Sequence, residues 1–291
     1  MSSTPEISKE LTFTQMLYYY RLGRLRRFFM PKAIAGARAQ NMKRAMATVE
    51  RRVQRDTDRK DFLYYILAAN DEKGMSRAEI DVNAFSFSTA GSESTATLMS
   101  AALFFTLSSP PALDRLLHEI RTRYASKDEI TLSSTTDLEY LDAVLTEASR
   151  LYPPVAGTLP RVVPAPGETI DGVFVPAGTS VGVNHFACYR DPHNFHRPAA
   201  FLPERWLPGT RDQNPFDADN RAALQPFSFG PRNCLGKNLA KAEMRLIMAK
   251  LLWQYDVKLV DEGGEWREQH KVFGFWVKPP LLCEITPVER G

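Results

Sequence analysis

The stretch FSFGPRNCLG, from Phe227 to Gly236, decides how the rest of the sequence is interpreted. Its cysteine, Cys234, stands directly before a helical pattern in which apolar residues recur every three or four positions from Leu235 to Trp253. The free N–H groups and the dipole at the start of a helix stabilise a thiolate. Cys234 is therefore a candidate metal ligand, whereas a lone cysteine in a core is usually inert packing.

The neighbours of Cys234 indicate what kind of group it would hold. Arg232 supplies a fixed positive charge two residues earlier and could hold a carboxylate. Gly230 and Gly236 allow tight turns and the close approach of a flat ligand to the backbone. A thiolate, a carboxylate clamp and a flat ligand are together the features of a haem iron held by cysteine.

Length and composition limit the other possibilities. The chain has 291 residues, typical of one or two domains, and 44% of them are hydrophobic. Three cysteines exclude a disulfide scaffold. The net charge of +3, from 37 basic and 34 acidic residues, is too small to indicate a nucleic-acid partner by itself. The polar residues 1–10 carry no secretory signal, which favours a reducing, intracellular setting.

The distribution of proline predicts a mainly helical fold with small β-sheets. Residues 1–109 contain only Pro5 and Pro31, and the other 18 of the 20 prolines follow. We expect helices at 61–70, 77–109, 112–125, 138–152 and 235–253, the second opened by a capping box at Ser76 and Glu79. Strands are expected at 161–163, 169–170 and 173–175, and in the tail around 263–264. Residues 84–107 carry one charge, so a membrane span must be considered, but their nine serines and threonines favour a core helix.

The stretch 227–236 resembles the haem-binding loop F-x-x-G-x-R-x-C-x-G of the cytochrome P450 family, with every fixed position present. The resemblance implies a haem (heme b, iron protoporphyrin IX) held through the thiolate of Cys234. It also implies that Phe227, Gly230, Arg232 and Gly236 bind this cofactor. The sequence looks most like fungal secondary-metabolism members and covers only the C-terminal part of the family's fold. We therefore expect residues 1–291 to form a single, incomplete cytochrome P450 domain whose N-terminal part is absent.

A second resemblance lies on the helix expected at 138–152. Glu147-Ala-Ser-Arg150 is similar to the family's E-x-x-R motif, and a spacing of three places both charges on one helix face. The segment Pro203-Glu-Arg-Trp206 resembles the family's P-E-R-F/W segment. The resemblance implies that Glu147, Arg150 and Arg205 form a buried network behind the haem, with a structural role.

A third resemblance lies in the long helix. Ala90-Gly-Ser-Glu-Ser-Thr95 is similar to the oxygen-activation motif A-G-x-D/E-T-T, which implies that Glu93, Ser94 and Thr95 are catalytic residues of a proton relay. An acid followed by a hydroxyl can deliver the two protons that cleavage of dioxygen requires. Ser94 departs from the pattern, which has threonine here. A serine keeps the hydroxyl but lacks the methyl group that fixes the rotamer of threonine. We therefore expect looser coupling between the consumption of reducing equivalents and the formation of product.

Two further basic features have alternative interpretations. Arg161 occupies the place where the resemblance implies an arginine on a haem propionate, and a surface arginine is the alternative. Lys237, Lys241 and Arg245 form an i, i+4, i+8 stripe. This stripe is either a solvated helix face or, as the resemblance implies, the side that meets an NADPH-dependent reductase.

The activity that the resemblance implies is monooxygenation. One oxygen atom of O2 enters an apolar small-molecule substrate and the other leaves as water. The alternative is a truncated, catalytically inactive pseudoenzyme or a haem-binding fragment.

The N-terminal region is aromatic and basic. From Arg21 to Arg55 it contains 11 lysines and arginines against one acid, Glu50. A basic and aromatic segment can lie on an anionic membrane surface, and we assign this role to residues 1–30. A solvated helix face is the alternative. Nucleic acid is not expected, because no binding motif accompanies the charge. The implied location is intracellular, with the endoplasmic reticulum membrane surface as a candidate and no transmembrane anchor in this chain.

Overall fold

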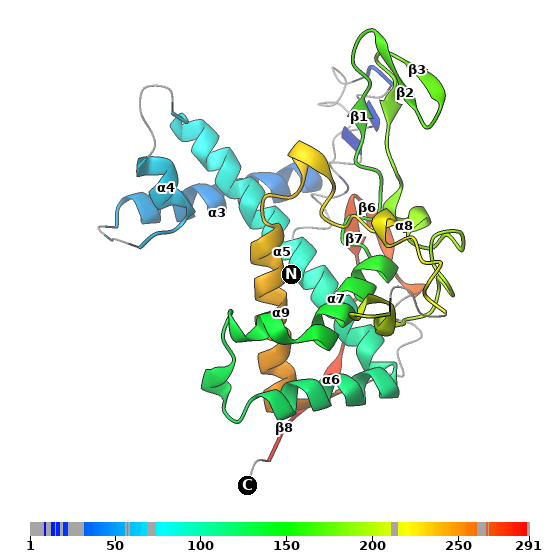
Figure 1. Ribbon diagram of the computed structural model, residues 1–291. Coiled ribbons are helices and arrows are strands. Elements are labelled where there is room, and N and C mark those ends of the chain that lie inside the picture. The colour runs from blue at the N-terminus through cyan, green and yellow to red at the C-terminus, as the bar shows by residue number, and fades with distance from the viewer. Residues whose placement is uncertain are drawn as a thin grey trace. The chain divides into compact units, whose positions relative to one another are not determined.

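The computed structural model of the chain describes residues 32–55, 57, 59–68, 74–210, 215–260, 266 and 268–289, together with 9, 13, 14, 16, 17 and 20–22. Helices dominate these residues, and the strands form small two-stranded sheets (Figure 1). The expected fold class, mainly α with small β-sheets, is confirmed. The basic and aromatic segment 1–30 lies almost entirely outside the described residues.

The chain divides into two units. The first contains residues 1–94 and 273–275, and the second contains residues 95–272 and 276–291. The first unit holds α3 (Lys32–Val53), α4 (Phe62–Ala68) and the N-terminal part of α5 (Arg77–Leu107). The boundary therefore falls inside the longest helix. That the whole chain forms one domain stays a prediction.

Local hydrogen bonds and charges organise the first unit. The predicted capping box opens α5: the Ser76 N–H donates to Glu79 Oε2 at 2.7 Å, and the Glu79 N–H donates to Ser76 Oγ at 3.3 Å. The Ser76 hydroxyl also donates to Glu79 Oε2 at 2.8 Å, and this bond, together with the one from the Ser76 N–H, holds the pKa of the Glu79 carboxyl below its usual value. Arg52 of α3 pairs with Asp61 before α4 at 2.5 Å, so part of the basic stretch is neutralised within the unit.

The core of the second unit is built from α6 (Pro110–Arg123), α7 (Glu139–Leu151) and α9 (Lys237–Gln254), with the C-terminal part of α5. All three helices lie within three residues of their predicted bounds. Helix α7 is buried on nearly every side, and its Leu141, Val144 and Ala148 are fully buried. A helix in this position can carry charges only if they are paired, because burying an isolated charge is costly.

The strands form local antiparallel pairs. β1 (Arg161–Val162) pairs with β4 (Ser180–Val181), β2 (Gly167–Ile170) with β3 (Val173–Pro176), and β5 (Tyr255–Leu259) with β8 (Cys283–Pro287). Two more short strands, β6 (Lys271–Phe273) and β7 (Phe275–Val277), precede β8. Asp171 (φ 48°) and Gly172 (φ 77°) join β2 to β3, as the sequence predicted, because a two-residue hairpin turn requires positive φ at both positions.

A long segment rich in proline connects β4 to α9. It contains the short helix α8 (His185–Cys188) and the 3₁₀ turns η4 (Pro203–Trp206), η5 (Arg221–Ala223) and η6 (Gly230–Arg232). Two earlier 3₁₀ turns, η2 (Lys127–Glu129) and η3 (Ser134–Asp137), join α6 to α7. The η4 turn packs against α7, so this segment supplies the partners for the charges of that helix.

Candidate functional site

The cysteine loop, residues 227–236, closes on itself immediately before α9. The Cys234 N–H donates to the Phe227 carbonyl at 2.8 Å, and the Asn233 N–H donates to the Gly230 carbonyl at 3.0 Å. Ser228 (φ 61°) and Gly230 (φ 79°) adopt the left-handed conformation that the reversal of the chain needs. The hydrogen bonds therefore hold Cys234 shortly before α9, which begins at Lys237 rather than at Leu235 as the sequence predicted.

Cys234 and two large apolar residues close to it in the sequence are exposed. Cys234 is exposed, and its neighbours Phe229 and Leu235 are 80% and 84% exposed. A Cβ atom at Gly236 would lie 4.0 Å from the Cys234 Sγ, so the glycine leaves this side of the sulfur free. An accessible thiol on a loop that also exposes two large apolar side chains fits the binding of a flat, apolar ring system with a metal at its centre.

The two arginines predicted to hold carboxylates lie on different elements. Arg232 is in the η6 turn and is exposed, and it makes no hydrogen bond or ion pair with another described residue. Arg161 is in β1, and its guanidinium donates to the Pro160 carbonyl at 3.0 Å. Both cations are therefore accessible to an anionic ligand, and the loop places Arg232 two residues from Cys234.

The predicted proton-relay residues lie in the middle of α5. The Ser94 Oγ donates to the Ala90 carbonyl at 2.6 Å, which points its proton along the helix and leaves its lone pairs outward. Thr95 is buried at 7% exposure, and Glu93 is half-buried. Glu93 and Ser94 belong to the first unit, and Thr95 begins the second. That they meet Cys234 at one site stays a prediction.

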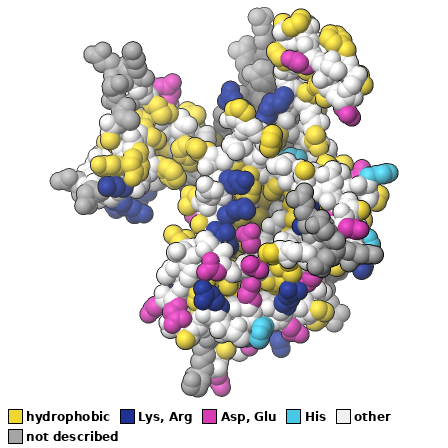
Figure 2. All heavy atoms as spheres, in the orientation of Figure 1, with side chains coloured by type: hydrophobic (Ala, Val, Ile, Leu, Met, Phe, Trp, Pro, Cys, Tyr) yellow, Lys and Arg dark blue, Asp and Glu magenta, His cyan; other side chains and the backbone are white. Residues whose placement is uncertain are grey.

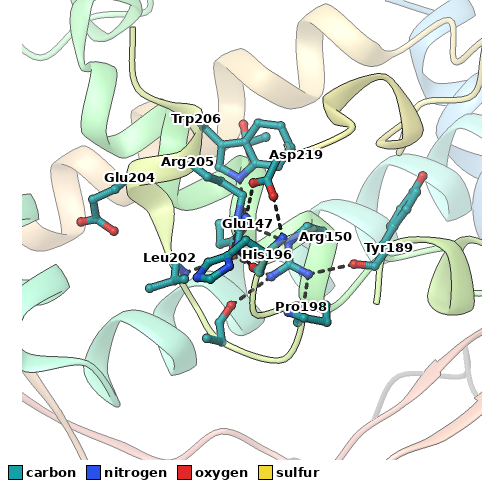
Figure 3. Close-up of polar contacts among 12 residues, drawn as sticks. Glu147, Arg150, Tyr189, His196, Pro198, Leu202, Glu204, Arg205, Trp206 and Asp219 are labelled. Atoms are coloured by element: carbon teal, nitrogen blue, oxygen red, sulfur yellow. Dashed lines mark hydrogen bonds and ion pairs between the residues drawn. The ribbon is translucent and has the colours of Figure 1, made fainter. Parts of the chain in front are cut away.

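Glu147 and Arg150 form an ion pair, as their spacing on one helix face allows, and the pair is buried, as the resemblance implied (Figure 3). Both side chains are 0% exposed, and Arg150 donates from Nε and Nη2 to the two carboxylate oxygens at 2.9 and 2.7 Å. The same guanidinium also donates to the backbone carbonyls of Tyr189 at 2.8 Å, Pro198 at 2.6 Å and Ala200 at 2.9 Å. Arg150 therefore ties the long loop to α7.

Arg205 completes the predicted network (Figure 3). It is also 0% exposed, and its Nε lies 3.2 Å from Glu147. Its Nη1 pairs with Asp219, and its Nη2 donates to the His196 carbonyl at 2.9 Å. The Trp206 Nε1–H donates to Glu147 at 2.8 Å. Two arginines and two carboxylates thus balance in the interior, as buried charges must.

Asp219 is the member of this network that sequence reasoning missed. It comes 14 residues after Arg205, in a loop without periodicity, so no spacing rule pointed to it. Its carboxylate also accepts the His196 N–H at 2.6 Å. The only sequence signal was the excess positive charge that Arg150 and Arg205 would leave beside a single glutamate.

A cleft of about 210 Å³ opens between α7, α9 and the segment that leads into the cysteine loop. Phe227, Lys237 and Lys241 line it, so two members of the predicted basic stripe face this cleft. The third, Arg245, is paired with Asp142 of α7 at 3.4 Å. Figure 2 shows Lys and Arg side chains gathered over α9 on this face.

Among the helices of the described residues, none is by itself both long and apolar enough to cross a membrane. The pair α5 and α6 meets the length and composition criteria only when the two are taken together, and it bends by 112° at the break between them.

Several fungal proteins are similar to this chain. Cytochrome P450 monooxygenase astJ of Aspergillus oryzae is 43% identical over 272 residues, which are 93% of this chain and 54% of that protein. Cytochrome P450 monooxygenase aclL of the same species is 46% identical over 239 residues, 82% of this chain and 48% of that protein. Versicolorin B desaturase of Dothistroma septosporum is 42% identical over 272 residues, 91% of this chain and 51% of that protein.

These similarities extend over nearly the whole chain. It spans about half the length of the curated relatives it matches. Residues 6–283 match the family model described as Cytochrome P450, a family whose members carry haem. The cysteine loop and the buried Glu147–Arg150–Arg205 network agree with this match. The chain belongs to the cytochrome P450 family.

Proposed function

We propose that this protein is a haem-thiolate monooxygenase that inserts one oxygen atom of O2 into an apolar small molecule in fungal secondary metabolism. The observation that carries the proposal is the exposed Cys234, held before α9 on a hydrogen-bonded loop that also exposes Phe229 and Leu235. Similar proteins named as monooxygenases support the reaction class. One relative is named a desaturase, so loss of two hydrogens is a second product type to assay.

The cofactor in this proposal is heme b. The Cys234 thiolate would bind its iron, Phe227, Gly230 and Gly236 would pack beside it, and Arg232 and Arg161 would hold its propionates. A bound haem would supply the iron at which dioxygen is activated, with the electrons coming from a separate donor. The chain orients the group through charge-assisted hydrogen bonds from the two arginines, which are stronger than neutral ones.

The proton relay in this proposal consists of Glu93, Ser94 and Thr95. The Ser94 hydroxyl donates to the Ala90 carbonyl at 2.6 Å, so in the relay this bond would open and the hydroxyl would accept a proton from the Glu93 side while it donates its own to the reacting side. The Glu93 carboxyl next to it is the source of protons, and the half-buried position of this carboxyl supports the role.

The electron donor in this proposal is an NADPH-dependent reductase. Lys237 and Lys241, at the cleft beside α9, suit an acidic partner, because complementary charge accelerates encounter. In this proposal the protein works inside the cell at the surface of the endoplasmic reticulum membrane, and the basic N-terminal region supports that location.

The test is reconstitution of the chain with haem, followed by a carbon-monoxide difference spectrum of the reduced protein. The parent is expected to give the Soret shift of a thiolate-ligated haem, and Cys234→Ala is expected to abolish it. Cys283→Ala is the matched control, because Cys283 is half-buried in β8 and burial raises the pKa of its thiol. A Cys234→Ala protein that kept the parent spectrum would exclude Cys234 as the ligand.

A further inference from the structure

We propose that Tyr189 is a positioning residue for the cysteine loop: its phenol oxygen holds the backbone at Gln225, where the chain enters the loop that presents Cys234. The inference deepens the proposed function, because the importance of this loop rests on Cys234 as a haem ligand. The contacts themselves belong to the chain, so they can be tested without haem.

Tyr189 connects the buried charge network to the cysteine loop. It follows α8 and is 0% exposed. Its carbonyl accepts the Arg150 Nη1–H at 2.8 Å, and its ring stacks on His185 with centroids 5.1 Å apart and planes at 13°. Its hydroxyl accepts the Gln225 N–H at 3.0 Å. One residue therefore contacts both the Arg150 guanidinium and the start of the loop.

Two further hydrogen bonds lead from Gln225 to the cysteine. The Gln225 carbonyl accepts the Ser228 N–H at 2.9 Å, which closes a tight turn around Pro226. The Phe227 carbonyl, inside that turn, accepts the Cys234 N–H at 2.8 Å. The position of the Cys234 backbone thus depends on a turn whose first N–H is held by Tyr189.

The phenol oxygen is the specific part of this contact. The ring packs in a small apolar cluster with Phe195 and Leu224, a role that phenylalanine would also fill. Burial raises the pKa of Tyr189, so the hydroxyl stays neutral and keeps accepting from the Gln225 N–H. Tyr189→Phe therefore removes one acceptor while leaving the ring, its stacking and the backbone carbonyl in place.

The experiment measures amide hydrogen exchange by mass spectrometry on the full chain, with Tyr189→Phe compared to the parent. Tyr124→Phe is the matched control: Tyr124 is also buried, and its hydroxyl donates to the Ser134 carbonyl at 2.9 Å, in the η3 turn. Tyr189→Phe is expected to accelerate exchange in residues 225–236 by about fivefold to tenfold, as the loss of one hydrogen bond predicts, with α6 and α7 unchanged. Tyr124→Phe is expected to leave residues 225–236 at the parent rate.

A second measurement connects this result to haem. In the haem-loaded protein, Tyr189→Phe is expected to lower the thiolate share of the carbon-monoxide spectrum at unchanged haem content. If the parent gave no thiolate spectrum, the proposed function would fail while hydrogen exchange still decided the role of Tyr189. Unchanged exchange in residues 225–236 would overturn the inference. So would faster exchange throughout α6 and α7, or failure of Tyr189→Phe to fold, since either result would assign the hydroxyl to the stability of the whole unit.

Discussion

Replacing Glu147 by alanine tests the energetic role of the buried network. The Glu147 carboxylate accepts from Arg150 Nε and Nη2, from Trp206 Nε1 and from the Leu202 N–H, and it pairs with Arg205. After the change, Arg205 keeps its ion pair with Asp219, but Arg150 keeps only backbone carbonyls. The substitution therefore leaves one buried guanidinium without a carboxylate.

The magnitude follows from that uncompensated charge. Removing one partner of a buried ion pair costs roughly 3–5 kcal/mol. This is a large share of the roughly 5–15 kcal/mol that stabilises a typical domain. With a urea m-value of about 2 kcal/mol/M, the unfolding midpoint should fall by about 2 M. The double variant Glu147→Ala/Arg150→Met should recover part of the loss, because it also removes the unpaired charge.

The assay is urea unfolding followed by tryptophan fluorescence. Asp142→Ala is the matched control on the same helix: Asp142 is 40% exposed and lies 3.4 Å from Arg245, so its loss should cost at most about 1 kcal/mol. Equal midpoint shifts for Glu147→Ala and Asp142→Ala would refute the reasoning. A double variant less stable than Glu147→Ala alone would also contradict it.

Three other predictions concern the cofactor, the relay and pH. Arg232→Gln should weaken haem binding by about 10- to 100-fold in a spectroscopic titration, because a charge-assisted hydrogen bond is lost, whereas Arg123→Gln, which breaks an exposed pair, should not change it. In an active holoprotein, Ser94→Ala should divert reducing equivalents to peroxide at normal haem content, and Thr95→Ala should matter less. Equal peroxide yields from Ser94→Ala and the parent would contradict the relay. Burial lowers the pKa of His270 from 6.5 to about 4. As the pH falls through this range, the imidazole is protonated in the unfolded chain but not in the folded one, so the free energy of unfolding should decrease. His270→Gln should remove that part of the pH dependence in unfolding measured across this range.

The sequence alone determined the features that depend on short spacing. A separation of three placed Glu147 and Arg150 on one helix face, and the capping box at Ser76 marked the start of α5. The pattern around Cys234 indicated the loop and the helix after it. These features could be predicted because their interactions join residues within one or a few turns of the chain.

Tertiary structure alone decided which distant groups complete the site. Asp219 balances the charge of Arg205 across 14 residues, and the hydroxyl of Tyr189 holds Gln225 across 36 residues. Neither contact has a periodicity that a sequence could display. Both contacts join residues of the proline-rich segment between β4 and α9, because the Arg205 guanidinium and the Gln225 N–H need partners in the interior. The sequence shows which groups need a partner when they are buried. Which residue becomes that partner depends on the path that the segment takes through the fold.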